Sequence, residues 1–295
     1  MFDIESYLNS LPKDIEEINV SNKGITYLDL TRFKKLKILY CDNKQLISLY
    51  LNEKLEKCFC HNNKLTSLHL NKDLQKLYCI HNQFTSLQLN ENLEILNCSH
   101  NKLTYLKLNE NLQILYCENN HLTSLHLNKN LKILCCNYNK LSSLQLNEKL
   151  EKICCNNNIL SYLHLNKQLQ YLSCANNKLS SLHFNEKLRE SYCYNNNLFS
   201  LFFNENLMIC LYYDNPICEI INPCDKIINY KEINKKLKIL NKFRYLYYCL
   251  KFKKLFRDLL WVKIREPKIR KRYSHDYLVK NLYEDTDLDE LLDNW

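Results

Sequence analysis

Apolar residues recur in this chain at a fixed interval of nineteen residues, and leucine marks the start of each unit. Counting that leucine as position 1, the apolar residues fall at positions 1, 4, 6, 11, 14 and 16. Positions 4 and 6 alternate with polar or aromatic neighbours, as do positions 14 and 16, which is typical of strands with one buried face. The leading leucines are Leu36, Leu55, Leu74, Leu93, Leu112, Leu131, Leu150, Leu169, Leu188 and Leu207.

This spacing predicts a stack of coils, each with two extended arms. A strict period means that no unit can bury its apolar face alone, so the units must stack. A helix in the second arm would need apolar residues three or four positions apart, and about eight residues cannot hold a helix and two corners. We therefore expect a parallel sheet from about Ile18 to Tyr212 and an opposite arm without helix.

Cysteine fills position 6 in nine consecutive units, where the alternation points it inward. A row of small, soft hydrophobic side chains explains this column. The alternative is a metal or redox array, although structural zinc sites usually show cysteine pairs about two to four residues apart. The predicted structural ladder comprises Cys41, Cys60, Cys79, Cys98, Cys117, Cys136, Cys155, Cys174 and Cys193.

Asparagine forms two further columns. At position 9 its amide can satisfy backbone groups in the turn after the strand, and stacked amides can bond to their counterparts in neighbouring coils. Position 17 is asparagine from Asn52 to Asn204, which predicts a second corner with left-handed geometry, since glycine is almost absent. Lys44 replaces the position 9 asparagine and Ser191 the position 4 apolar residue, so local slackness is expected at both.

The pattern Leu-x-x-Leu-x-Cys-x-x-Asn-x-Leu resembles the hallmark segment of leucine-rich repeats, and it runs from Leu36 to Ile220. The following Leu-x-Leu-Asn arm resembles the short type found in bacteria and large viruses. This resemblance implies a repeat solenoid with a parallel β-sheet on one face, and residue spacing adds extended arms on the other face and a helical C-terminal cap. We expect an N-terminal cap over residues 1–14, about 11 units over 15–222, and a basic helical segment with an acidic tail over 223–295.

The outward positions 3 and 5 of the predicted sheet carry aromatic and isoleucine side chains over several coils. An exposed apolar patch of that extent usually marks an interaction surface, and aromatic anchors are typical of protein-binding hot spots. The alternative is that these side chains only stack on one another along the sheet, but stacking would not explain their absence from the outward positions of the other arm. The predicted partner-binding residues are Tyr40, Phe59, Tyr78, Ile95, Ile114, Tyr116, Ile133, Tyr171 and Tyr192.

Charge is concentrated at the C-terminal end. The net charge is +9 for the chain, but residues 226–272 carry +14 and residues 273–295 carry −6, which leaves +1 for the rest. Pro216 and Pro223 interrupt the repeat, and apolar residues then follow at helical spacing as far as Arg265. A helical cap on the last coil is the expected role. A membrane surface or nucleic acid as the partner of residues 226–272 is the alternative.

The last fifty-five or so residues, including Trp261 to Pro267 and the ending Asp287 to Trp295, resemble a C-terminal module of proteins from Mimivirus-like giant viruses of amoebae. The resemblance implies a viral origin, expression in host cytoplasm and an amoebal host as a source of partners. No apolar run approaches the ~20 residues that span a bilayer, and Met1 to Pro12 does not read as a signal peptide. The expected location is therefore a reducing cytoplasm.

Catalysis is not expected. Bacterial repeat proteins of similar pattern carry a cysteine-dependent ubiquitin ligase domain, for which Cys218, Cys224 or Cys249 would be the nucleophile, but about seventy residues after Ile220 are too few and offer only His275 as a base. Two further cysteines, Cys135 and Cys154, occupy outward position 5 in adjacent coils, where they could bridge under oxidation or bind a soft metal. The sequence predicts no metal, cofactor or small-molecule substrate, and favours a protein-interaction scaffold.

Overall fold

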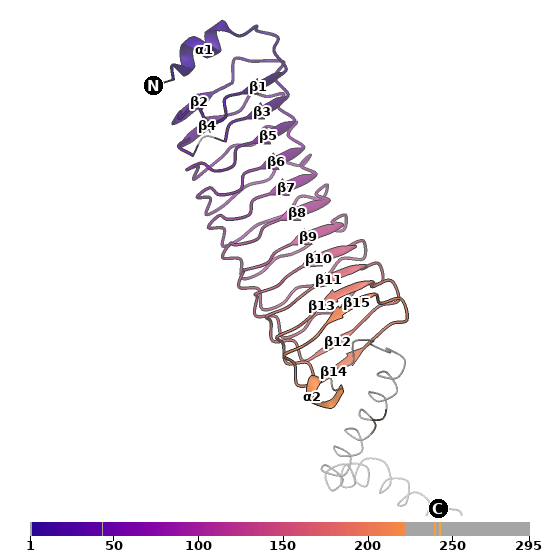
Figure 1. Ribbon diagram of the computed structural model, residues 1–295. Helices are drawn as coiled ribbons and strands as arrows, with labels where there is room; N and C mark the ends of the chain where they lie inside the picture. Colours follow the sequence, from indigo (N-terminus) through magenta and orange to yellow (C-terminus); the bar gives the residue numbers. More distant parts are fainter. Residues whose placement is uncertain (1, 43, 222–238, 240–241, 243–295) are drawn as a thin grey trace, which may run out of the picture. The chain divides into compact units, whose positions relative to one another are not determined.

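The computed structural model describes residues 2–42, 44–221, 239 and 242, and the chain divides into two units, residues 1–237 and 238–295. In the first unit, successive coils stack and contribute one strand each to an 11-stranded parallel sheet (Figure 1). Its strands in order are β1 (Glu17–Asn19), β3 (Ile38–Tyr40), β5 (Lys57–Phe59), β6 (Lys76–Tyr78), β7 (Ile95–Asn97), β8 (Ile114–Tyr116), β9 (Ile133–Cys135), β10 (Lys152–Cys154), β11 (Tyr171–Ser173), β13 (Glu190–Tyr192) and β15 (Ile209–Leu211).

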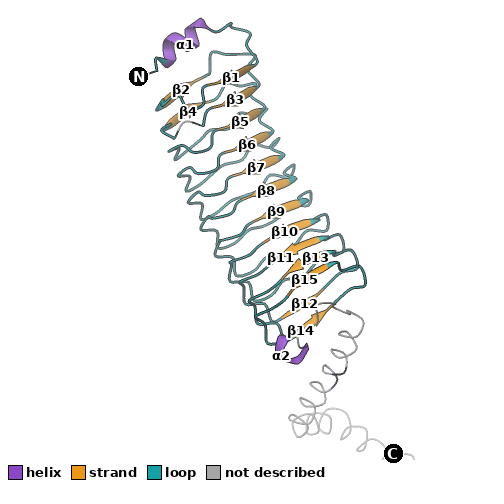
Figure 2. Ribbon diagram, in the orientation of Figure 1, coloured by secondary structure: helices purple, strands orange, loops and turns teal. Residues whose placement is uncertain are grey.

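The predicted extent of the sheet and the absence of helix from the opposite arm are confirmed. Among the described residues between 17 and 211 there is no helix, and most of each opposite arm runs as loop (Figure 2). Short parallel pairs form there only near the two ends of the stack. They join β2 (Tyr27–Asp29) to β4 (Ser48–Tyr50) and β12 (Ser181–His183) to β14 (Ser200–Phe202).

Each sheet strand is three residues long and buries its central residue, at position 4. The position 6 cysteine follows directly; all nine of these cysteines are fully buried, and none of them is in a disulfide. The backbone continues the inter-coil ladder there, since the Cys117 N–H donates to the Cys135 carbonyl at 2.8 Å. Ser191 does not interrupt the sheet, because it pairs with Leu172 on one side and Cys210 on the other, so the expected slackness is absent from the strand pairing.

The position 9 asparagines join consecutive coils, but not through the predicted amide-to-amide ladder. The Asn120 amide nitrogen donates to the carbonyls of Cys98 in the preceding coil and of Cys117 in its own coil, at 3.0 and 3.1 Å. Its amide oxygen accepts the Leu103 N–H of the preceding coil at 2.9 Å. Every contact is therefore from side chain to backbone, and each asparagine satisfies buried backbone groups that two coils share.

The left-handed residue of each coil is at position 8, so its prediction at position 17 is wrong. Position 8 has φ between 52° and 57° in every coil in which that residue is described, whether it is asparagine, histidine, tyrosine or aspartate, and Lys44 at position 9 has φ 65°. The constant asparagine at position 17 serves a different purpose. The Asn71 amide nitrogen donates to the carbonyls of Asn52 and Leu55 at 2.6 and 3.0 Å, which secures the second corner.

The last described coil differs from the others in the backbone hydrogen bonds at positions 10 and 11. In a regular coil the position 10 N–H donates to the position 11 carbonyl of the preceding coil, and the position 11 N–H needs the asparagine of the coil that follows. In the last described coil position 10 is Pro216, which has no N–H and therefore cannot donate this hydrogen bond. The Ile217 N–H at position 11 instead donates to the Leu198 carbonyl at 2.9 Å, and α2 (Cys218–Ile221) follows.

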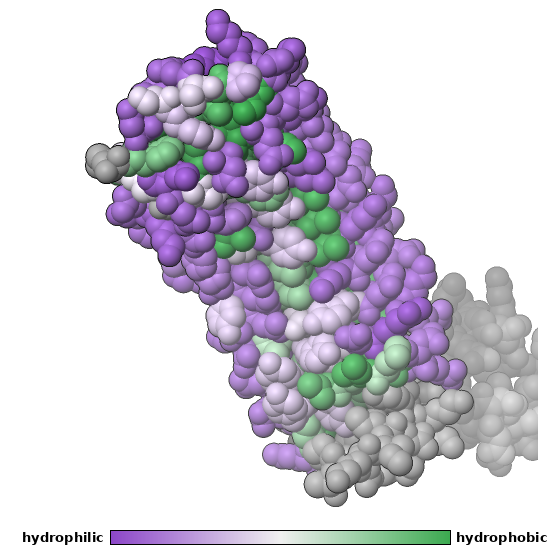
Figure 3. Space-filling model, turned by 45° about the horizontal axis from the view of Figure 1, so that its top comes forward, coloured by the Kyte–Doolittle hydropathy of each residue, from purple (hydrophilic) through white to green (hydrophobic). Residues whose placement is uncertain are grey.

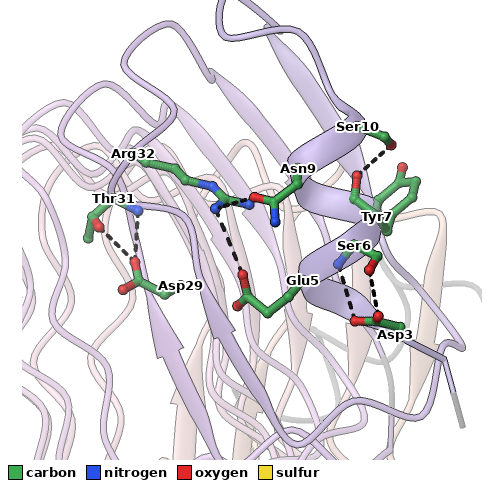
Figure 4. Close-up of polar contacts among 9 residues, drawn as sticks. All are labelled: Asp3, Glu5, Ser6, Tyr7, Asn9, Ser10, Asp29, Thr31 and Arg32. Atoms are coloured by element: carbon green, nitrogen blue, oxygen red, sulfur yellow. Dashed lines mark hydrogen bonds and ion pairs between the residues drawn. The ribbon is translucent and has the colours of Figure 1, made fainter.

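At the other end, α1 (Ile4–Ser10) buries Leu8 against the core of the first coil. Asp3 caps the helix by accepting the Ser6 N–H at 3.1 Å and the Ser6 hydroxyl at 2.6 Å (Figure 4). Arg32 ties the helix to the first coil through a 2.9 Å hydrogen bond to the Asn9 side-chain oxygen. The helical C-terminal cap and the basic segment, predicted within residues 223–295, lie outside the described residues.

Candidate binding face

The nine side chains predicted to bind a partner all lie on the outer face of the 11-stranded sheet, and all nine are half-buried. Neighbouring parallel strands are about 4.8 Å apart, so side chains in register pack on their counterparts. On the side that Figure 3 presents, apolar and weakly polar residues form a band along the stack between hydrophilic flanks. Because the nine predicted side chains are half-buried and lie on adjacent strands of one sheet, they form a packed surface layer.

Three aromatic rings at position 5 form a stack along this face. The Tyr40 and Phe59 ring centroids are 4.7 Å apart with 9° between the ring planes, and Phe59 and Tyr78 are 4.8 Å apart with 6°. Both faces of the Phe59 ring are thus covered by its neighbours, so the stack offers ring edges to a partner. Asn97 then interrupts the row before Tyr116. The predicted stacking and the predicted binding role are compatible, because the same rings remain partly exposed.

A row of three isoleucines at position 3 extends the apolar area. Ile95, Ile114 and Ile133 are register partners in three consecutive strands, β7, β8 and β9, and each is half-buried. Lys57 and Lys76 occupy the same position in the two strands before them, beside the aromatic stack. The apolar patch therefore turns from aromatic rings at one end to aliphatic side chains at the other.

A second aromatic pair lies further along the face. The rings of Tyr171 and Tyr192 are 5.7 Å apart and tilted by 40°. The Lys152 ammonium lies 4.6 Å from the centroid of the Tyr171 ring, within cation–π range. The Tyr192 hydroxyl donates to a Glu190 carboxylate oxygen at 3.3 Å. This end of the face is more polar, and its rings already have partners within the molecule.

The premise that aromatic side chains avoid the opposite arm is wrong. Tyr50, Tyr105, Tyr162 and Phe199 are exposed there, and Tyr162 is the most exposed of them at 64%. Tyr105 and Tyr162 lie three coils apart, so they are single exposed rings. The Tyr27 and Tyr50 rings of the opposite arm also touch, with centroids 5.6 Å apart. The sheet face differs because three rings stack in consecutive strands beside a row of isoleucines, which makes its apolar patch larger.

Of the three cysteines considered as nucleophiles, Cys218 alone lies among the described residues, and its surroundings do not favour a catalytic role. The Cys218 thiol is half-buried and donates to the Tyr212 carbonyl at 3.1 Å, and burial raises its pKa above the ordinary value. A catalytic cysteine needs a lowered pKa or an adjacent base. Cys224, Cys249 and His275 lie outside the described residues. In the ladder, burial raises the pKa of the Cys98 thiol to about 12.

The described residues also bear on membrane insertion and metal binding. None of their helices is long and apolar enough to cross a membrane. Within the same residues, no group of three or more histidine, cysteine, aspartate or glutamate side chains is arranged to hold a metal ion.

Comparison with known proteins places this geometry among solved repeat structures. No family model and no curated protein matches the sequence. The structure is similar to YopM from Yersinia enterocolitica, with a TM-score of 0.65 and 26% identity over 68% of this chain and 47% of that chain. The leucine-rich-repeat domain of APL1B has a TM-score of 0.60 and 18% identity over 72% of both chains. The fold is a leucine-rich-repeat solenoid.

A third similar structure bears on the cysteine column. The functional domain of InlJ from Listeria monocytogenes, which includes a cysteine ladder, has a TM-score of 0.57 and 26% identity over 68% of this chain and 53% of that domain. The chain thus spans about half the length of the YopM and InlJ chains that it matches.

Proposed function

We propose that this protein binds a protein partner through the outer face of its sheet, at the patch formed by Tyr40, Phe59, Tyr78 and Tyr116 together with the isoleucine row. The observation that carries the proposal is the contiguous Tyr40–Phe59–Tyr78 stack beside an aliphatic row on one face. Such a surface has few charges to desolvate and presents rigid rings, which lose little side-chain entropy on binding.

The patch has the dimensions of a short recognition element. From Tyr40 to Tyr116 the position 5 residues lie in five consecutive strands, and four of the five are aromatic. At ~4.8 Å per strand the row is about 20 Å long, comparable to a short extended peptide or one face of a helix. The proposal includes a reducing cytoplasm as the location, because a ladder of cysteines without disulfides suits it, and host cytoplasm if the chain is viral.

The test is a pair of double variants in the full chain. The partner is captured by photo-crosslinking from Ile95 replaced with a photoreactive amino acid, and its affinity for each variant is then measured. Tyr78→Ser with Tyr116→Ser should weaken binding by about 2–4 kcal/mol, the range of interface hot spots, with folding retained. Tyr105→Ser with Tyr162→Ser is the matched control, because these tyrosines are exposed on the opposite arm.

Equal affinity of the two double variants would contradict the proposal. The alternative, association of residues 226–272 with a membrane surface or nucleic acid, predicts a different dependence on salt and on the tyrosines. Binding would then fall steeply with added salt, as expected where phosphate contacts release counterions, and would be indifferent to Tyr78 and Tyr116.

A further inference from the structure

Two cysteines stand on the outer face of the sheet, apart from the buried ladder. Cys135 in β9 and Cys154 in β10 occupy position 5 of adjacent strands and are register partners. Tyr116 precedes them in the same row and Ser173 follows. Cys135 is 7% exposed and Cys154 is half-buried, so the pair opens to solvent on the Cys154 side.

The two thiols are hydrogen-bonded to each other and differ in acidity. The hydrogen bond from Cys135 and the nearby Lys152 ammonium lower the pKa of Cys154, although burial and Glu118 oppose them. The same hydrogen bond, together with burial, raises the pKa of Cys135. The two thiols of this in-register pair therefore differ, and the partly exposed Cys154 is the more acidic. A partly exposed thiol with a lowered pKa is a better metal ligand than a fully buried thiol whose pKa is raised.

The geometry favours a bridging ion over a disulfide. The two side chains leave parallel, in-register strands in the same direction, so their Cβ atoms are about 4.8 Å apart. A disulfide requires Cβ atoms about 3.8 Å apart and a Cβ–S–S–Cβ torsion near 90°. An ion held between two sulfurs needs neither condition. Thiolates select soft ions, and no third ligand side chain joins the pair among the described residues, which excludes ions that require four protein ligands.

We propose that Cys135 and Cys154 form a binding site for one soft monovalent cation of the Cu(I) class, held by two thiolate sulfurs. On binding, both sulfurs release their remaining protons to solvent, two metal–sulfur bonds form, and nothing is oxidised or reduced. The resulting centre carries one negative charge, which the Lys152 ammonium of the same strand offsets. The site is independent of the proposed partner-binding function, since it needs no partner.

The test is an anaerobic titration of the full chain with Cu(I) against a competing chromophoric Cu(I) chelator. Each of the single variants Cys135→Ser and Cys154→Ser should bind one Cu(I) ion per chain fewer than wild type. Cys218→Ser is the matched control and should bind as wild type does, because Cys218 is also half-buried but its thiol donates to the Tyr212 carbonyl. Cys135→Ala serves as a second variant if a buried hydroxyl at position 135 disturbs folding.

A second readout locates the ion. After one equivalent of Cu(I), brief alkylation and peptide mass spectrometry should show Cys135 and Cys154 protected and Cys218 modified at its metal-free rate. The proposal fails if Cys135 and Cys154 are alkylated equally with and without Cu(I), or if both serine variants keep the wild-type stoichiometry. It fails also if peroxide joins the pair as a disulfide while Cu(I) leaves both thiols unprotected.

Discussion

Replacing a position 9 asparagine in the middle of the stack tests the account of what joins the coils. In Asn120→Ala the Leu103 N–H loses its only hydrogen-bond acceptor and stays buried, which costs about 1–3 kcal/mol. The carbonyls of Cys98 and Cys117 lose one donor each but keep another, from Asn101 and Asn139. With about 0.5 kcal/mol for each of these weakened contacts, the expected loss in unfolding free energy is about 2–4 kcal/mol.

The assay is urea unfolding of the full chain followed by circular dichroism, with midpoints and slopes compared because a repeat array need not unfold in two states. Asn111→Ala is the matched control. Its amide also donates to a backbone carbonyl, that of Glu91 at 2.9 Å, but the residue is exposed, so the expected loss is below about 0.5 kcal/mol. If the two alanine variants unfold at the same urea concentration, the inter-coil role of the buried asparagines is refuted.

Three further substitutions probe other columns in the same assay. Cys117→Ser should lower the unfolding free energy by about 1–3 kcal/mol, because it buries a hydroxyl without an assured partner, and a wild-type midpoint would contradict the apolar role of the ladder. Ser191→Ala should leave the unfolding free energy unchanged or raise it by about 1 kcal/mol, because it removes a fully buried hydroxyl. A clear decrease in the unfolding free energy would show that this hydroxyl is well bonded. Tyr138→Asn should stabilise by about 0.5–1 kcal/mol, because tyrosine there adopts φ 54°; Tyr162→Asn, outside the left-handed region, should show no such gain.

The sequence was a sufficient guide to the fold wherever a column has one physical role. Burial of positions 1, 4 and 6 follows from alternation, and so does the extended opposite arm, because hydrophobic spacing distinguishes strand from helix. Residue pattern could not identify which residue of each coil has a left-handed backbone conformation. Position 8 holds Tyr138, His81 and Asn119 alike, so the backbone conformation is imposed by the stack rather than chosen by residue type. Asparagine at position 17 is constant for the hydrogen bonds of its amide.

The candidate site was less accessible to sequence reasoning. Alternation places Tyr40, Phe59 and Tyr78 on the outer face, and strand spacing brings their rings into contact. It does not say that Phe59 has both faces covered, because ring orientation depends on side-chain torsions. The asymmetry between Cys135 and Cys154 depends on one hydrogen bond and on Lys152, which the repeat pattern does not encode.

The way in which the last coil closes its hydrogen bonds affects how an array of this kind can change in length. Each nineteen-residue coil before it, from Leu36 onward, receives an acceptor from the position 9 asparagine of its successor. A tandem duplication of nineteen residues between Leu36 and Asn215 therefore supplies both the donor and the acceptor that the new coil needs. A unit added beyond Pro216 would instead follow a coil whose Ile217 N–H is already bonded to Leu198. Recombination can therefore add or remove whole coils before Pro216 without leaving backbone groups unpaired. The coil that carries Pro216 and Ile217 has to stay at the C-terminal end of the repeats, because its position 11 N–H is already bonded.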